Sequence, residues 1–153
     1  MAIPLWQRFI GLCLYILPWS DALPFGSHLF LEFPILQWLA IPALPLIFLE
    51  RSIPFGSILL FFVLFLTVIR NPKVPYFIRF NSLQSLLIDI AVVLMGYAFQ
   101  ILIQPFGMNL VTRTLLSTAF LGVLTLVLFS IKECIQGKEP NLPAISEAVR
   151  IQL

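Results

Sequence analysis

The carboxylate of Asp89 is the side chain in this sequence that most needs a chemical explanation. It lies in an apolar run from Ser82 to Gln104, within a chain that is 60% hydrophobic. A charge inside hydrocarbon is costly, so an acid in such a run must face protein, water or a partner molecule. We favour a functional or partner contact for Asp89, because an asparagine would form hydrogen bonds to neighbouring helices without carrying a charge.

Polar side chains share one face of this run when it is drawn as a helix. At about 100° per residue, the polar and small residues fall within an arc of about 100°. They are Asn81, Ser82, Ser85, Asp89, Gly96 and Gln100. Polar groups in lipid need partners, so this stripe is expected to face other helices or a wet groove. Two interpretations stay open. One is a hydrophilic path or partner contact formed by Asn81, Ser85, Asp89 and Gln100, and the other is hydrogen bonding between packed helices.

A second pattern of small residues lies in the last apolar run. Thr118, Gly122 and Thr125 share one helical face with Thr114. Small residues at this spacing let two helices approach closely. We therefore predict that this face packs against the stripe that contains Asp89.

Residues suited to catalysis or metal binding are scarce. His28 is the single histidine, and Cys13 and Cys134 are far apart and outside any CxxC pair. The sequence also lacks GxSxG, HExxH and a glycine-rich phosphate loop. We therefore expect no enzyme activity, no cofactor and no metal site. A net charge of +2 gives no indication of a nucleic-acid partner.

Composition and length describe an all-α integral membrane protein. Only 10% of the 153 residues are charged, and the mean hydropathy is +1.03. A chain of this length holds about four or five spanning helices and little else. The apolar stretches predict four spans in a bundle at 33–132, followed by a polar tail at 133–153. The predicted spans are 33–49, 54–69, 82–104 and 111–132.

The N-terminal segment, residues 1–32, is expected to lie outside this bundle. The stretch from Leu5 to Leu17 is too short to cross a bilayer comfortably, and Trp6 and Trp19 bracket it as interfacial aromatic residues do. We predict an amphipathic helix in the membrane surface, followed by a turn. The alternative is that this stretch forms part of a tilted span.

The basic residues predict an orientation for the chain. With four spans, the N-terminus, the 70–81 loop and the tail share one side of the membrane. Most of the nine basic residues fall on that side. They are Arg8, Arg70, Lys73, Arg79, Lys132, Lys138 and Arg150. The positive-inside rule then places both termini on the side of synthesis.

Several short motifs, in order along the chain, resemble those of the Tic twenty family. This family comprises the twenty-kilodalton membrane subunits of the translocon at the inner chloroplast envelope, together with cyanobacterial relatives. Arg79, Phe80, Gln84 and Asp89 are similar to the family's RFxxxQxxLLDI signature. Three further pieces resemble other family motifs, with Ala22 where the family often has Gly. They are Leu17-Pro18-Trp19-Ser20-Asp21, Arg70-Asn71-Pro72, and Pro143-Ala144-Ile145-Ser146-Glu147-Ala148.

This resemblance implies a subunit of a complex that moves preproteins across the plastid inner envelope, or across the corresponding cyanobacterial membrane. Both termini would then face the stroma or the cytoplasm. The implied partners are the lipid bilayer, other translocon membrane subunits or a second copy, and preproteins in transit. The family has no assigned catalytic chemistry. A small ion or solute channel or transporter and a non-conducting scaffold subunit remain as alternatives.

Overall fold

The computed structural model describes residues 2–153, and every regular element in that range is a helix. Four helical runs are long and apolar enough to cross a membrane. They cover Leu5–Glu32, Pro34–Ser52, Tyr76–Leu102 and Leu110–Ile135, and a shorter apolar run covers Gly56–Ile69. The predicted all-α class with four long apolar helices is therefore confirmed, although Leu5–Glu32 is one of the four and the predicted span 54–69 is not. Met1 lies outside the described residues.

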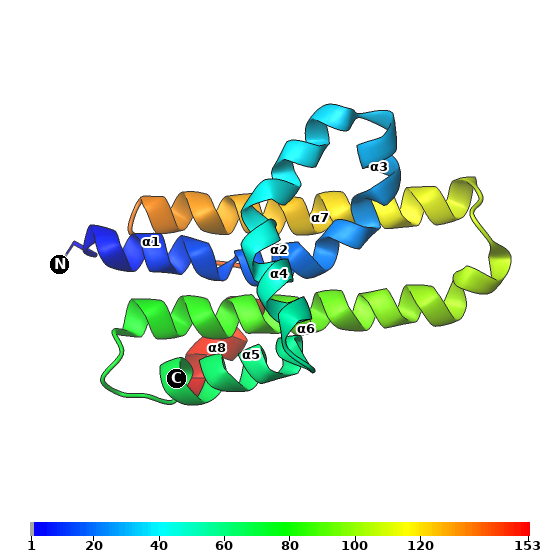
Figure 1. Cartoon of the computed structure of the whole chain (residues 1–153). Coiled ribbons are helices and arrows are strands. Elements are labelled where there is room, and N and C mark those ends of the chain that lie inside the picture. Colours follow the sequence, from blue (N-terminus) through cyan, green and yellow to red (C-terminus); the bar gives the residue numbers. More distant parts are fainter. Residues whose placement is uncertain (1) are drawn as a thin grey trace.

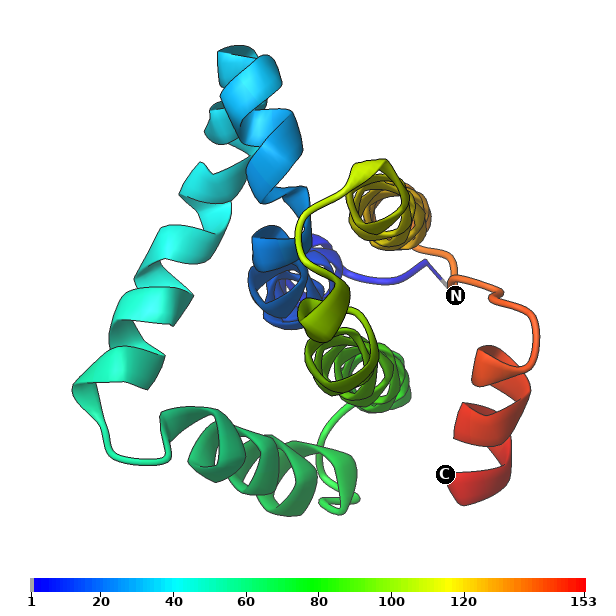
Figure 2. The same ribbon diagram turned by 90° about the vertical axis from the view of Figure 1, so that its right-hand side faces the viewer.

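Three long helical runs lie side by side and form the core. α6 (Tyr76–Leu102) and α7 (Leu110–Ile135) are single α-helices, and the N-terminal run packs against both (Figures 1 and 2). The N-terminal run comprises α1 (Leu5–Leu14), α2 (Ile16–Ala22), the 3-10 helix η1 (Leu23–Gly26) and α3 (Ser27–Glu32). Tyr15, Trp19, Ile88, Phe120 and Val127 belong to the buried apolar cluster between these runs.

The structure does not show the predicted interfacial helix at Leu5 to Leu17. This stretch is the first part of a 28-residue run, and Tyr15 within it is 0% exposed. The run is interrupted at Tyr15 because Pro18 has no N–H to donate to the carbonyl of Leu14, four residues earlier. The short apolar length that suggested a surface helix therefore reflects a proline break inside a longer run.

The close approach of the N-terminal run to α7 depends on Gly26. A Cβ atom built at Gly26 would lie 2.7 Å from the ring of Phe120, which is 0% exposed. The same ring packs on Trp19 at a centroid distance of 5.2 Å and on Phe30 at 5.4 Å. Because Phe120 is held from two sides, a larger residue at position 26 would have to push the two helices apart.

The stretch from Pro34 to Ile69 forms a largely exposed arm that packs on the core through α2 and α6. Its elements are the 3-10 helix η2 (Pro34–Ala43), α4 (Leu44–Ser52), α5 (Gly56–Leu64) and the π-helical η3 (Phe65–Ile69). In Figure 2 the arm extends away from the three core helices and returns to α6 near its end. Trp38, Phe48 and Phe62 along it are exposed, so its surface is suited to lipid or to another chain.

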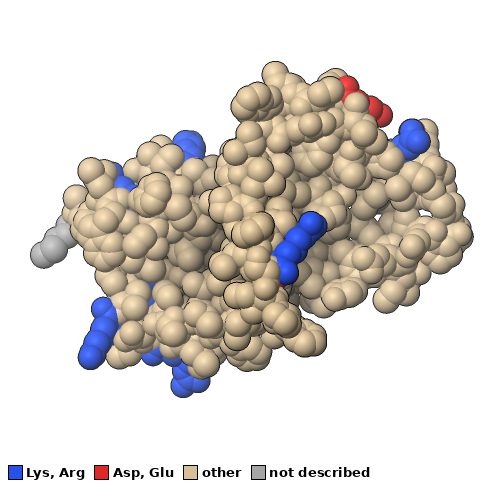
Figure 3. Space-filling view, in the orientation of Figure 1, with Lys and Arg blue, Asp and Glu red and all other residues tan. Residues whose placement is uncertain are grey.

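The N-terminus, the turn before α6 and the C-terminus lie at one end of the molecule (Figure 1). Arg8 joins the N-terminus to the end of α7, because its guanidinium donates to the carbonyl oxygen of Ile3 at 2.8 Å and to that of Ile135 at 3.2 Å. Arg79 donates to the carbonyl oxygen of Ile69 at 2.8 Å and so fixes the end of the arm. Figure 3 shows Lys and Arg side chains gathered at this end of the face drawn.

A short 3-10 helix, η4 (Gln104–Phe106), precedes the turn into α7, and the side chain of Asn109 caps the first turn of α7.

The tail turns back and packs on the first half of α6. α7 ends before Gly137, which has a φ of 72°. The chain then reverses, and α8 (Ile145–Gln152) lies against α6.

Candidate functional site

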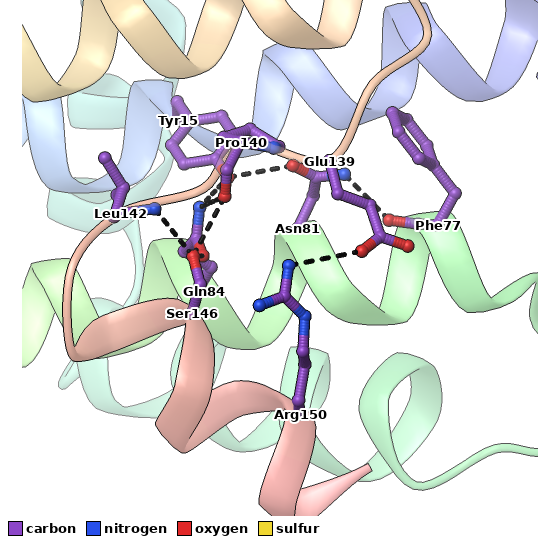
Figure 4. A network of polar contacts seen from close by, with 9 residues as sticks. All are labelled: Tyr15, Phe77, Asn81, Gln84, Glu139, Pro140, Leu142, Ser146 and Arg150. Atoms are coloured by element: carbon purple, nitrogen blue, oxygen red, sulfur yellow. Dashed lines mark hydrogen bonds and ion pairs between the residues drawn. The ribbon is translucent and has the colours of Figure 1, made fainter.

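A network of buried hydrogen bonds joins the N-terminal run, α6 and the tail (Figure 4). The Tyr15 hydroxyl donates to Oδ1 of Asn81 at 2.8 Å, and the Gln84 amide donates to the Tyr15 oxygen at 3.1 Å. Gln84 also donates to the carbonyl oxygen of Pro140 at 3.1 Å and accepts from the Ser146 hydroxyl at 2.7 Å. Tyr15, Asn81, Gln84 and Ser146 are all 0% exposed. These neutral, mutually satisfied groups fix the tail to the core.

The residues of the predicted signature that precede Asp89 hold this same region together. Phe80 is 0% exposed, and the guanidinium carbon of Arg150 in α8 lies 5.6 Å from its ring centroid. Arg150 also pairs with Glu139 at 3.8 Å (Figure 4). Together with Gln84 in the network and Arg79 at the end of the arm, Phe80 stabilises the fold rather than facing an opening.

The second half of α6 lines an open groove of about 1200 Å³. The other walls come from α2 and η1, from the start of α5 and from the first turns of α7. The arm packs on α6 through η3, near Phe80 and Leu83, and the groove begins beyond that contact. Much of its wall is apolar. The polar side chains in the wall are Asp21, Ser57, Asp89, Tyr97, Gln100, Gln104 and Thr112.

Two carboxyl groups, those of Asp21 and Asp89, lie close to each other in the wall of this groove. Glu50 lines an adjoining cavity of about 470 Å³ together with Asp21, Arg51 and Ser57. Oδ1 of Asp89 and Oε1 of Glu50 are buried without a hydrogen-bond partner.

The predicted polar stripe of α6 is divided between these two environments. Asn81 and Ser85 are 0% exposed, and Ser85 donates to the carbonyl oxygen of Ser82 at 2.9 Å. Asp89 and Gln100 instead line the groove. The structure therefore brings only the second pair together at an opening, and it places Asn81 and Ser85 inside the packed core.

The small-residue face of α7 points away from the other helices. Thr118, Gly122 and Thr125 are exposed, and nothing lies within 4 Å of a Cβ atom built at Gly122. The two threonine hydroxyls donate to carbonyl oxygens four residues earlier in their own helix, at 2.7 and 2.8 Å. The predicted packing of this face on α6 does not occur within the chain. α7 instead turns Phe120 and Val123 inward, which buries more apolar surface.

Sequence reasoning missed Asp21 and Glu50 as neighbours of Asp89. Asp21 is the only charged residue between Arg8 and Glu32. A lone acid in an apolar stretch is the same signal that singled out Asp89. Interpreting the stretch before Asp21 as a surface helix places this acid in a turn, where a charged side chain needs no partner.

Known proteins match this chain over most of its length. The family model described as chloroplast import apparatus Tic20-like matches residues 3–149. The chain is 41% identical to a Tic20 family protein of Synechocystis sp., over 96% of this chain and 92% of that protein. It is 35% identical to the Tic20 family protein Ycf60 of Gracilaria tenuistipitata, over 91% and 71% of the two chains. It is 30% identical to the chloroplastic protein TIC 20-v of Arabidopsis thaliana, over 96% and 71%.

The matched residues include both the buried network and the groove. Proteins of this family are non-enzymatic integral membrane proteins of the chloroplast inner envelope or of cyanobacterial membranes, and they are involved in protein translocation. On the strength of this match from residue 3 to residue 149, the chain belongs to the Tic20, or Tic twenty, family.

Proposed function

We propose that this chain is a membrane subunit of a protein translocon and contributes to preprotein passage across the chloroplast inner envelope or the corresponding cyanobacterial membrane. Family membership supports the general role. The observation that carries the proposal to particular residues is the groove of about 1200 Å³ with Asp89 in its wall. A helical bundle that served only as a packed scaffold would fill such a space with side chains.

A single copy of the chain provides only part of such a path. The groove is open, so other translocon subunits or a second copy must supply the remaining wall. Asp89 and Gln100 are the predicted site residues that face the opening, whereas Asn81 and Ser85 support them from within the core. Preproteins in transit and neighbouring subunits are therefore the partners that we expect at this face.

A small ion or solute channel is the second candidate. The contact between the carboxyl groups of Asp21 and Asp89 favours it, because acids within membrane spans often mark ion and proton pathways. Conductance of the purified protein in planar bilayers separates the two functions. Steady ion conductance that Asp89→Asn abolishes, with normal preprotein import, would favour the channel over the translocon subunit.

The test of the main proposal compares Asp89→Asn with Asp89→Leu in a strain that lacks the native protein. Asparagine keeps the shape and most hydrogen bonding but removes the charge, whereas leucine removes both. If the charge acts in translocation, both variants should accumulate and both should fail to restore import or growth at matched protein levels.

Other outcomes of this comparison are equally informative. A fully active Asp89→Asn variant together with an inactive Asp89→Leu variant would mean that Asp89 serves only as a hydrogen-bonding residue. A fully active Asp89→Leu variant would remove any role of this residue in import. Gln100→Leu, in the same groove, is the matched variant that changes polarity without changing charge.

The orientation of the chain is a separate part of the proposal. Because the basic residues gather at the end that carries both termini, we infer that this end faces the stroma or the cytoplasm. Epitope tags at residues 2 and 153 should both be protected or both be digested when sealed vesicles of known sidedness are treated with protease. Opposite accessibility of the two tags would contradict the arrangement.

A further inference from the structure

The groove combines an apolar wall with an acidic side chain halfway along α6. Asp89 lies at the midpoint of α6, which runs from Tyr76 to Leu102. Tyr97 and Leu94 in the same wall are 59% and 63% exposed, so a broad apolar surface borders the acid. A surface of this kind inside a bilayer is accessible to lipid chains and to helices of other polypeptides.

No cation among the described residues, 2–153, forms an ion pair with Asp89. Among residues 2–153, the only ion pair within 4.0 Å joins Arg150 to Glu139, far from the groove. The residues that line the groove include no Lys, Arg or His. Arg51 lines the adjoining cavity but forms no ion pair with Asp21 or Glu50. A buried carboxylate oxygen of Asp89 is also left without a hydrogen-bond donor.

We propose that the groove is the docking site for a transmembrane helix of another subunit, an apolar helix that carries one basic side chain near its middle. The apolar face of such a helix would cover the exposed wall of α6. Its basic group would lie beside Asp89 and Asp21 and supply the missing donor and positive charge. The inference rests on the proposed function only in that the chain works within an assembly.

The chemistry of the groove argues against the other occupants. Lipid acyl chains bring no charge to the middle of the span, and anionic headgroups would be repelled by the carboxyl groups. A second copy of this chain fits less well, because Arg51 already lies beside Asp21 and Glu50 of its own copy, and the basic residues of the two longest helices lie near their ends. They are Arg79 in α6, and Arg113 and Lys132 in α7.

The experiment uses the full chain in lipid nanodiscs with a photo-reactive amino acid at position 97, on the wall of the groove. The probes are synthetic helices of leucine and alanine that differ only at the central residue, which is arginine, glutamine, leucine or glutamate. Arginine is chosen because it stays charged in an apolar environment. We expect about tenfold more cross-linking with the arginine-centred helix than with the leucine-centred helix.

Four variants of the protein give matched controls. The same photo-reactive residue at Leu121, which is 50% exposed on α7, reports contacts outside the groove. Asp89→Asn and, independently, Asp21→Asn should abolish the preference for arginine while cross-linking to the leucine-centred helix persists. Gly96→Leu should reduce cross-linking of every helix, because a Cβ at Gly96 meets Phe25 at an ordinary 3.6 Å and the added side chain fills the groove.

The proposal is overturned if arginine- and leucine-centred helices cross-link equally at position 97. It is also overturned if position 97 captures only lipid, or if position 121 shows the same preference for arginine. Since Asp21→Asn tests the charge without altering α6, misfolding of the Asp89 variant would not decide the result. The assay contains no preprotein, so its failure leaves the import test of the proposed function intact.

Discussion

The two halves of α6 use polar side chains in opposite ways. In the first half, the amide groups of Asn81 and Gln84 are fully buried. Asn81 is hydrogen-bonded to Tyr15 of the N-terminal run and to Phe77 of α6, and Gln84 is hydrogen-bonded to Pro140 of the tail. In the second half, Asp89 and Gln100 line a groove, and Asp89 keeps a buried oxygen atom without a partner. The same helix thus contains one polar region in which the amides are satisfied and only the Ser82 hydroxyl lacks a partner, and one in which a carboxylate oxygen beside an opening lacks a partner.

The difference lies in what covers each half. The tail and the first helix cover the start of α6, and they bring hydroxyl and carbonyl groups that match its amides (Figure 4). The arm contacts α6 mainly through η3, and the later part of the helix keeps an open side. Satisfied polar groups indicate a structural role, whereas unsatisfied ones beside an opening indicate contact with something outside the chain.

The sharpest test of this contrast makes the same change in each half. Gln84→Leu should lower the free energy of unfolding by about 1–3 kcal/mol for each buried partner that loses its hydrogen bond. Gln100→Leu should change it by less than about 0.5 kcal/mol, because the side chain faces the groove. Thermal unfolding in detergent measures both. Equal losses for the two variants would mean that the halves do not differ in polar packing.

Two glycines extend the comparison to apolar packing. Gly26→Ala should cost about 1–3 kcal/mol, because the new Cβ would lie 2.7 Å from the buried ring of Phe120. Gly122→Ala should cause no loss, because nothing lies within 4 Å of its Cβ position. The measurement is again the melting temperature in detergent. If Gly122→Ala destabilises the purified chain as much as Gly26→Ala, the outward face of α7 is packed after all.

The smallest effect concerns the turn that leads the tail onto α6. Ala144 has a φ of 64°, and the N–H of Ile145 donates to the carbonyl oxygen of Pro143 at 2.7 Å, which makes a tight γ-turn. Ala144→Gly should stabilise the protein by about 0.5–1 kcal/mol, because glycine adopts positive φ without steric cost. Ala144→Val should have the opposite effect. Limited proteolysis between Gly137 and Ile145 reports release of the tail, and faster cleavage of the glycine variant would contradict this account.

The sequence predicts the helices whose positions follow from long uninterrupted apolar runs. The stretches predicted at 82–104 and 111–132 correspond to α6 (Tyr76–Leu102) and α7 (Leu110–Ile135). The predicted start of α6 is several residues too late. Tertiary contacts with the tail and through Arg79 hold the first turns of this helix, and these contacts cannot be read from the local sequence. As a consequence, Asp89 lies at the middle of its helix rather than nearer its beginning.

The candidate site was only partly accessible from the sequence. The cost of a charge in hydrocarbon singled out Asp89, and helical periodicity placed Gln100 on the same face. Periodicity gives the direction of a side chain but not what covers it, so it could not separate Asn81 and Ser85 from this pair. The contact between Asp21 and Asp89 joins helices that are distant in sequence, and no local sequence pattern indicates it.

The central position of the first helix has a consequence for how the protein is made. Tyr15 is hydrogen-bonded to α6, Asp21 lies beside Asp89, and Arg8 is hydrogen-bonded to Ile135. Each polar contact of the N-terminal run with α6 and α7 therefore involves residues that are synthesised much later. At about 5–20 residues per second, the ribosome needs several seconds or more to supply them. During that interval Tyr15 and Asp21 lack the partners that α6 provides, whereas Ser20 and Trp19 already have theirs at Leu17 and Leu39. The polar contacts of this run with α6 and α7 are therefore complete only after α7 has been synthesised.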